Sequence, residues 1–255
     1  MGKIFVITSG KGGVGKTTTA INLGAALNSF GEEVIIADGN LSTPNVGLHL
    51  GAPIVPVSLT HVLLGKAKLD EAIYEHESGT KILPCSLSIK EMSKIKKDKL
   101  YDVSKKLRKL ADYIILDSAA GLGEEALAAI ESGDEVIIVT NPELPSVTDA
   151  LKAASVVRDL GKEIKGVIIT RVQKDGLDMP YSNIKEMLEL PILGVIPEDK
   201  SVRKALVRKD AVFHTHPKSG ASRAYKEIAA KISGRYKPRE KLSMYQSLMA
   251  RFGLR

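Results

Sequence analysis

The eight residues GKGGVGKT, at positions 10–17, follow directly on the apolar run IFVI at positions 4–7. Their spacing is that of a phosphate-binding loop, which joins a strand to a helix. In such a loop the glycines let backbone N–H groups crowd around a triphosphate, the lysine reaches the β and γ phosphates, and the hydroxyl binds Mg²⁺. The expected phosphate-binding residues are Gly12, Gly13, Val14, Gly15, Lys16, Thr17 and Thr18, with Thr17 also on the metal. A glycine-rich turn without a ligand is disfavoured, because a strand pattern precedes the loop and a helix pattern follows it.

Apolar, β-branched runs alternate with helical patterns along the chain. The expected strands are 4–7, 34–37, 81–83, 113–116, 135–139, 167–170 and 192–196. The expected helices are 16–30, 98–110, 124–131, 146–160, 181–188 and 221–232. This alternation predicts an α/β fold with a doubly wound, mostly parallel sheet and helices on both faces. Ligands of such sheets bind at the carboxyl ends of the strands.

The length and the cysteine content of the chain limit the classes of protein to which it can belong. The 255 residues suit one domain, expected at 1–234, with a linker at 235–240 and a separate helix at 241–255. The single cysteine, Cys85, excludes a disulfide framework and is expected near a strand end as a small apolar residue. The N-terminal apolar run is too short for a signal peptide, and no run is long enough to predict a membrane span.

The net charge of +7 is unevenly placed. Residues 89–109 carry +6 and residues 235–255 carry +5, so the rest of the chain is acidic. Such segments are often only solvated faces, but they are also typical of surfaces that bind anionic lipid or nucleic acid. The sequence leaves these alternatives open.

Two of the expected strands run directly into an aspartate. Asp38 follows the strand at 34–37, and Asp117 follows the strand at 113–116. A carboxylate at a strand end beside a phosphate loop supplies the hard oxygen ligand that Mg²⁺ prefers, often through water. We therefore predict that Thr17, Asp38 and Asp117 hold Mg²⁺. The alternative for each aspartate is a cap or turn residue.

These segments together resemble the MinD/ParA family of ATPases, and particularly its archaeal MinD-like members. KGGVGKTT at 11–18 is similar to the family's deviant Walker A motif, 38–51 to its switch I, and DSAAGLG from Asp117 to its Walker B and switch II. Similar segments at 57–65, 70–74, 140–144 and 194–199 extend the resemblance over almost the whole chain. It implies a P-loop ATPase that uses ATP, ADP and Mg²⁺. In that family the lysine corresponding to Lys11 crosses a homodimer interface to the partner's nucleotide; the alternative is a solvated lysine.

The resemblance also assigns site residues, with two departures from the family pattern. The adenine is expected beside Arg171, Pro197 and Glu198, although the family usually has Asn where this chain has Thr170. The family has Asp-x-Asp where this chain has Asn40, and its second Asp positions the attacking water. An amide can hydrogen-bond a water but cannot take its proton. We therefore expect slow hydrolysis, or a water oriented by Asn40 much as glutamine does in other switches. The expected catalytic residues are Lys11, Lys16, Asp38, Asn40 and Asp117.

The tail combines an apolar stripe with basic residues. The stripe consists of Leu242, Tyr245, Leu248, Met249 and Phe252. A short basic amphipathic helix suits an anionic membrane surface, and the resemblance implies a membrane-targeting helix. The alternative is a helix that docks on the body or on a partner. One such tail binds weakly, so an ATP-dependent homodimer with two tails would bind more stably.

Three functions compete at this point. A MinD-like positioning ATPase would be cytoplasmic, peripheral on the inner face of the cell membrane when ATP-bound, and stimulated by an unidentified activator or cargo protein. A ParA-like partition ATPase would instead bind nonspecific DNA, but phosphate contacts need no apolar stripe. A metal-cluster carrier is disfavoured because the chain has one cysteine. We expect His214-x-His216 to be a loop rather than a metal site.

Overall fold

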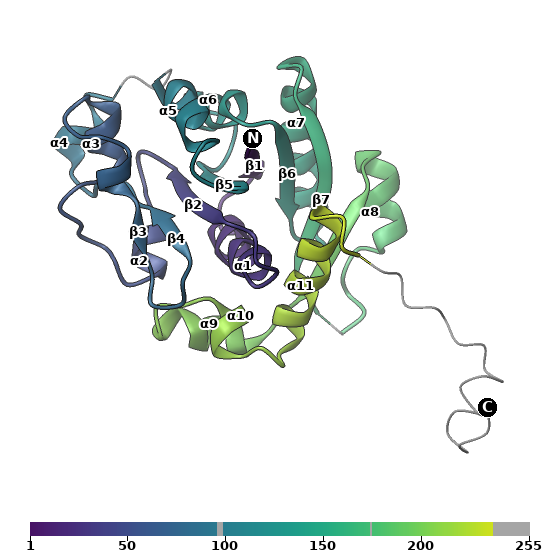
Figure 1. Cartoon of the computed structure of the whole chain (residues 1–255). Helices are drawn as coiled ribbons and strands as arrows, with labels where there is room; N and C mark the ends of the chain where they lie inside the picture. Colours follow the sequence, from purple (N-terminus) through teal and green to yellow (C-terminus); the bar gives the residue numbers. More distant parts are fainter. Residues whose placement is uncertain (96–98, 174, 237–255) are drawn as a thin grey trace.

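A single eight-stranded sheet organises the computed structural model, which describes residues 1–95, 99–173 and 175–236 (Figure 1). The strand order is β3-β4-β2-β5-β1-β6-β7-β8, and only the β3–β4 pair is antiparallel. The strands are β1 (Lys3–Thr8), β2 (Val34–Gly39), β3 (Tyr74–Glu75), β4 (Lys81–Leu83), β5 (Tyr113–Ser118), β6 (Glu135–Thr140), β7 (Glu163–Val172) and β8 (Ile192–Pro197). This arrangement confirms the predicted fold class.

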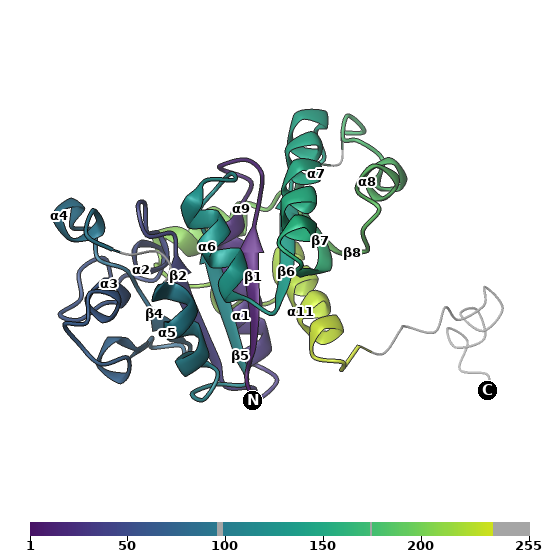
Figure 2. The same cartoon turned by 90° about the horizontal axis from the view of Figure 1, so that it is seen from above.

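Helices cover both faces of this sheet. They are α1 (Lys16–Asn28), α2 (Val46–His49), α3 (Leu59–Leu63), α4 (Ile89–Met92), α5 (Lys99–Leu107), α6 (Glu124–Ser132), α7 (Leu144–Asp159), α8 (Tyr181–Leu188), α9 (Lys200–Val207), α10 (Val212–Thr215) and α11 (Gly220–Ile232), with a 3-10 turn at Asp70–Ala72. α5, α6 and α7 lie on one face, and α1, α10 and α11 on the other (Figure 1). Seen from above, α3 and α4 lie beyond one end of the sheet and α8 beyond the other (Figure 2).

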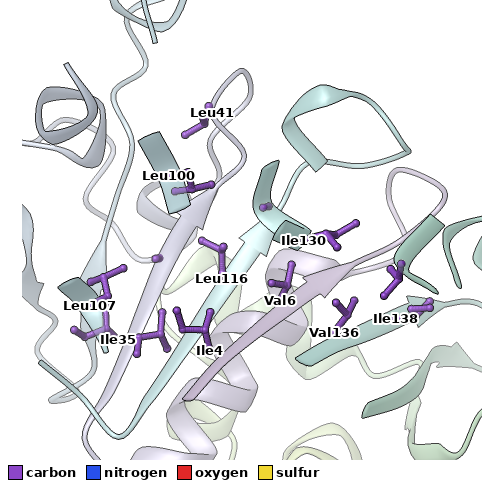
Figure 3. Packing of buried hydrophobic residues seen from close by; sticks show 14 of the residues in the cluster. Ile4, Val6, Ile35, Leu41, Leu100, Leu107, Leu116, Ile130, Val136 and Ile138 are labelled. Carbon is purple, nitrogen blue, oxygen red and sulfur yellow. The ribbon is translucent and has the colours of Figure 1, made fainter. Parts of the chain in front are cut away.

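The central strand β1 shows why the sheet is buried on both sides. Ile4 and Val6 point into the cluster beneath α5, α6 and α7 (Figure 3), whereas Phe5 and Ile7 join the cluster with α1 and α11. Alternate side chains of a strand face opposite sides of a sheet. Each fully buried aliphatic side chain stabilises the fold by about 1.5–3 kcal/mol. The continuous apolar runs in the sequence are therefore strands with two buried faces.

Several short elements differ from the sequence-based expectation. The loop expected around His214 is wrong, because α10 forms there: Asn22 on α1 accepts the N–H of Phe213, and the Thr215 N–H bonds the carbonyl of Ala211. β3 and α9 were not expected at all. Cys85 does lie just after β4, where it is buried and its thiol donates to the carbonyl of Asp38. The expected C-terminal helix lies outside the described residues.

Candidate nucleotide site

The phosphate loop connects the carboxyl end of β1 to the amino end of α1. Gly13 and Gly15 have φ of 78° and 95°, in the left-handed region that favours glycine. Gly10 lies against α7, and a Cβ built on it would meet the carbonyl oxygen of Asp149 at 2.0 Å. The backbone geometry therefore requires glycine at these positions. Residues 12, 13 and 15–18 line one cavity of about 460 Å³, the phosphate cavity, together with Asn40, Thr43 and Asn45.

Lys16, Thr17 and Asp117 meet behind the loop. The pairing of β1 with β5 places Asp117 beside Ile7, and its Oδ2 accepts the Thr17 hydroxyl at 2.6 Å. Burial raises the pKa of Asp117 to about 6, against the lowering effects of Thr17 and Lys16. Burial likewise lowers the pKa of Lys16, although Asp117 opposes that shift. An anionic ligand with its metal would offset both costs.

Asp117 also has the chemistry to hold a metal. Its Oδ1 is buried and has no hydrogen-bond partner among the described residues. No group of three His, Cys, Asp or Glu side chains in the described ranges is arranged to hold a metal ion. Mg²⁺ does not need such a group, because it keeps several waters and binds through one or two carboxylates plus phosphate oxygens. Thr17 and Asp117 fit that requirement.

The structure gives Asp38 a different set of contacts. Its carboxylate is fully buried and accepts backbone N–H groups from Asn40 (3.2 Å), Asn45 (2.8 Å) and Val46 (2.9 Å). Burial, and then the charge of Asp117, raise the pKa of Asp38 to about 8, against these three bonds. Asp38 thus anchors the loop that follows β2, and its role as a Mg²⁺ ligand remains a prediction.

Asn40 lines the phosphate cavity but uses its amide within its own loop. Its Nδ2 donates to the Thr43 carbonyl at 2.7 Å, and its Oδ1 accepts the Thr43 hydroxyl at 3.1 Å and backbone N–H at 3.3 Å. The side chain therefore closes a small ring across residues 40–43. Orienting a water would require it to share or release these bonds, so the proposed water-positioning role remains untested.

The three residues expected at the adenine lie together. Arg171, Pro197 and Glu198 line a cavity of about 250 Å³ that also includes Gly15 and Thr18 from the phosphate loop. The backbone at this point is unusual, because Arg171 has a φ of 56° in the left-handed region. The Glu198 N–H then bonds the Val172 carbonyl, which holds the ends of β7 and β8 together. The arrangement is consistent with the predicted base contacts.

Sequence reasoning treated Thr170 only as a departure, and the structure gives it a role. Its hydroxyl lies 2.6 Å from the carbonyl of Val14 in the phosphate loop, to which it donates. The same oxygen accepts the Asn141 amide at 2.9 Å. Thr170 therefore ties the phosphate loop to β7 and connects both to Asn141, which follows β6. A polar residue directly after the apolar run at 167–169 was the signal in the sequence.

Lys11 is the one expected catalytic residue on the surface of the loop. Its side chain is exposed, while its carbonyl accepts the Ser9 hydroxyl at 2.6 Å. The backbone is thus held and the side chain extends into solvent. Its predicted contact with a partner's nucleotide remains a prediction.

A phosphate loop of this geometry on this sheet defines a P-loop nucleotide-binding domain. Residues 5–212 match the family model described as the CobQ/CobB/MinD/ParA nucleotide binding domain, and the chain belongs to this family.

Individual relatives extend the match over nearly the whole chain. The chain is 40% identical over 230 residues to an uncharacterized ATP-binding protein of Methanocaldococcus jannaschii, covering 90% of this chain and 87% of that protein. It is 34% identical over 250 residues to the septum site-determining protein MinD of Thermotoga maritima, covering 94% and 91%. The solved structure of MinD from Pyrococcus horikoshii, complexed with Mg-ADP, aligns with a TM-score of 0.87 at 35% identity, covering 96% and 99%.

Proposed function

We propose that this chain is a MinD-like ATPase that switches between two states: an ATP-bound dimer on a membrane and an ADP-bound monomer. The observation that carries the proposal is the arrangement of Lys11, exposed on a phosphate loop whose second lysine, Lys16, is buried beside Asp117. Similarity to MinD over more than nine-tenths of the chain supports the same assignment. The cargo would be the cell-division site or another machine at the cell surface.

The site would hydrolyse ATP by positioning and charge stabilisation. Loop N–H groups and Lys16 would hold the phosphates, and Thr17 and Asp117 would hold Mg²⁺, which would neutralise phosphate charge. Lys11 would reach the partner's phosphates. Asn40 would lie where a water is oriented, and its amide cannot remove the proton. Hydrolysis would therefore be slow and would depend on stimulation by a partner protein.

Membrane attachment would come from the tail at 241–255. No helix in the described part of the chain is both long and apolar enough to cross a bilayer. Attachment would then be peripheral, on the inner face of the cell membrane. Two tails in a dimer would convert weak binding into stable binding by raising the effective concentration of the second tail.

Co-sedimentation with anionic vesicles tests this proposal. The full chain and a chain ending at Tyr236 are each mixed with vesicles in ATP, ADP or no nucleotide. The expected result is pelleting of the full chain in ATP only, lost on truncation. Pelleting without nucleotide dependence, or none at all, would overturn the membrane switch.

A ParA-like function on DNA is the second candidate, because one observation favours it. The exposed side of α5 and the turn after it carries Lys99, Lys105, Lys106 and Lys109. Among the described residues none of these lysines forms an ion pair. Lysines on one face can bind phosphates of any sequence. ATP-dependent, salt-sensitive DNA binding by a chain that fails to pellet with vesicles would favour this alternative.

A further inference from the structure

One wall of the phosphate cavity is a single short loop, residues 40–45, here called the switch loop. Asn40, Thr43 and Asn45 from this loop face the cavity. The two ends of the loop are held by the buried Asp38 carboxylate. It accepts the backbone N–H groups of Asn40, Asn45 and Val46. These three bonds do not involve Ser42 or Thr43, at the tip of the loop.

The tip of the loop is held by a carboxylate from helix α6. Ser42 donates its backbone N–H to Oε2 of Glu125 at 3.1 Å and its hydroxyl to Oε1 of the same residue. Glu125 lies in the first turn of α6, 83 residues further along the chain. It does not line the phosphate cavity, and its two bonds to Ser42 connect it to the loop that does.

The contact between Ser42 and Glu125 can set the position of the loop, because each of the two residues is held in place by its own surroundings. Ser42 lies inside the ring that Asn40 and Thr43 close with their mutual hydrogen bonds. α6 is anchored by Ala126, Ala129 and Ile130, which are completely buried against the sheet. A charge-assisted pair of bonds therefore connects a fixed helix to the ring that presents Asn40.

We infer that Glu125 is a positioning residue: it holds the switch loop against α6 and thereby sets where Asn40 lies at the phosphate cavity. α6 follows Asp117 after a short connection, so the same contact couples the segments that follow β2 and β5. The predicted effect on ATP hydrolysis rests on the proposed function. The loop contact itself is a property of the chain without nucleotide.

Hydrogen exchange on the full chain, without nucleotide, tests the contact directly. In Glu125→Ala the amides of Ser42 and Thr43, at the tip of the loop, are expected to exchange about tenfold faster, since the bond from the Ser42 N–H to Glu125 is lost. Glu125→Gln keeps one acceptor and should restore part of the protection. Glu131→Ala is the matched control, because it removes one exposed carboxylate from the same helix. Equal exchange in the Glu125→Ala and Glu131→Ala chains would overturn the inference.

Single-turnover ATP hydrolysis with Mg²⁺ tests the consequence. Glu125→Ala is expected to slow the chemical step about tenfold while ATP affinity changes less than threefold, because orientation rather than binding is lost. Ser42→Ala should slow it less, and the double variant should match Glu125→Ala, since both act through one contact. Independent, multiplying effects would contradict the inference. A wild-type chain without hydrolysis would count against the proposed ATPase and leave the exchange result to decide the loop contact.

Discussion

At the residue scale, the site depends on groups whose ordinary ionisation is disturbed by burial. Asp38 and Asp117 have raised pKa values and Lys16 a lowered one, each chiefly because burial penalises the charged form. The sequence predicted these three residues because phosphate and Mg²⁺ binding restricts the residue types that can serve. It did not predict the contacts of Asn40 with Thr43, which depend on how the loop folds back.

Asn40→Asp is expected to raise the rate of ATP hydrolysis about tenfold or more. A carboxylate at this position can accept a proton from the attacking water, which an amide cannot. The measurement is phosphate release in a single turnover with saturating ATP and Mg²⁺. Asn45→Asp, which adds the same charge to the same cavity wall, is the control. An unchanged rate in Asn40→Asp would contradict the idea that the amide slows this enzyme.

At the element scale, the long elements were predictable and the short ones were not. All seven expected strands are present, because β-branched runs buried on both faces have a strong sequence signal. α9 has a local N-cap in Asp199, which accepts the N–H of Ser201, a signal that sequence reasoning missed. α10 is held by a tertiary cap instead: Asn22 on α1 accepts the N–H of Phe213. β3 has two residues and depends on its partner strand. Such contacts join distant parts of the chain and leave no local pattern.

Thr170→Val is expected to lower the free energy of unfolding by about 1–3 kcal/mol. The substitution keeps the shape of the side chain but removes the hydroxyl. The Val14 carbonyl then loses this buried donor, and the Asn141 amide loses one of its acceptors. Urea unfolding measures the change. Thr148→Val is the control, because Thr148 is only half-buried and its hydroxyl bonds the Leu144 carbonyl within α7. Its effect should stay within about 0.5 kcal/mol. Equal stabilities of the two variants would mean that the link between β7 and the loop contributes nothing.

At the scale of the whole molecule, the two ends of the parallel strands have different chemistry. The expected nucleotide-binding residues lie at the carboxyl ends of the strands, as is usual for an α/β sheet. Ion pairs lie at the amino ends, including Arg108 with Asp134 and Arg235 with Glu32. The ATP-dependent association proposed above would use the end of the sheet that carries Lys11.

Lys11→Ala is expected to abolish the ATP-dependent dimer while the chain still binds ATP. The exposed side chain does not support the loop, whose backbone is held by Ser9. Light scattering with and without ATP measures the mass. Lys226→Ala on α11 is a control for loss of one exposed lysine. A Lys11→Ala chain that dimerises normally would make this lysine an ordinary solvated charge.

The position of β1 in the sheet has a consequence for synthesis on the ribosome. β1 and its loop emerge first, yet its neighbours begin only at Tyr113 and Glu135. The cavity predicted to take the adenine is later still, because Pro197 and Tyr225 line it. The nascent chain must therefore carry an apolar strand without its partners while β2, β3 and β4 are translated. Pairing over such long separations is slow, so this chain should depend on cellular factors that shield exposed apolar segments.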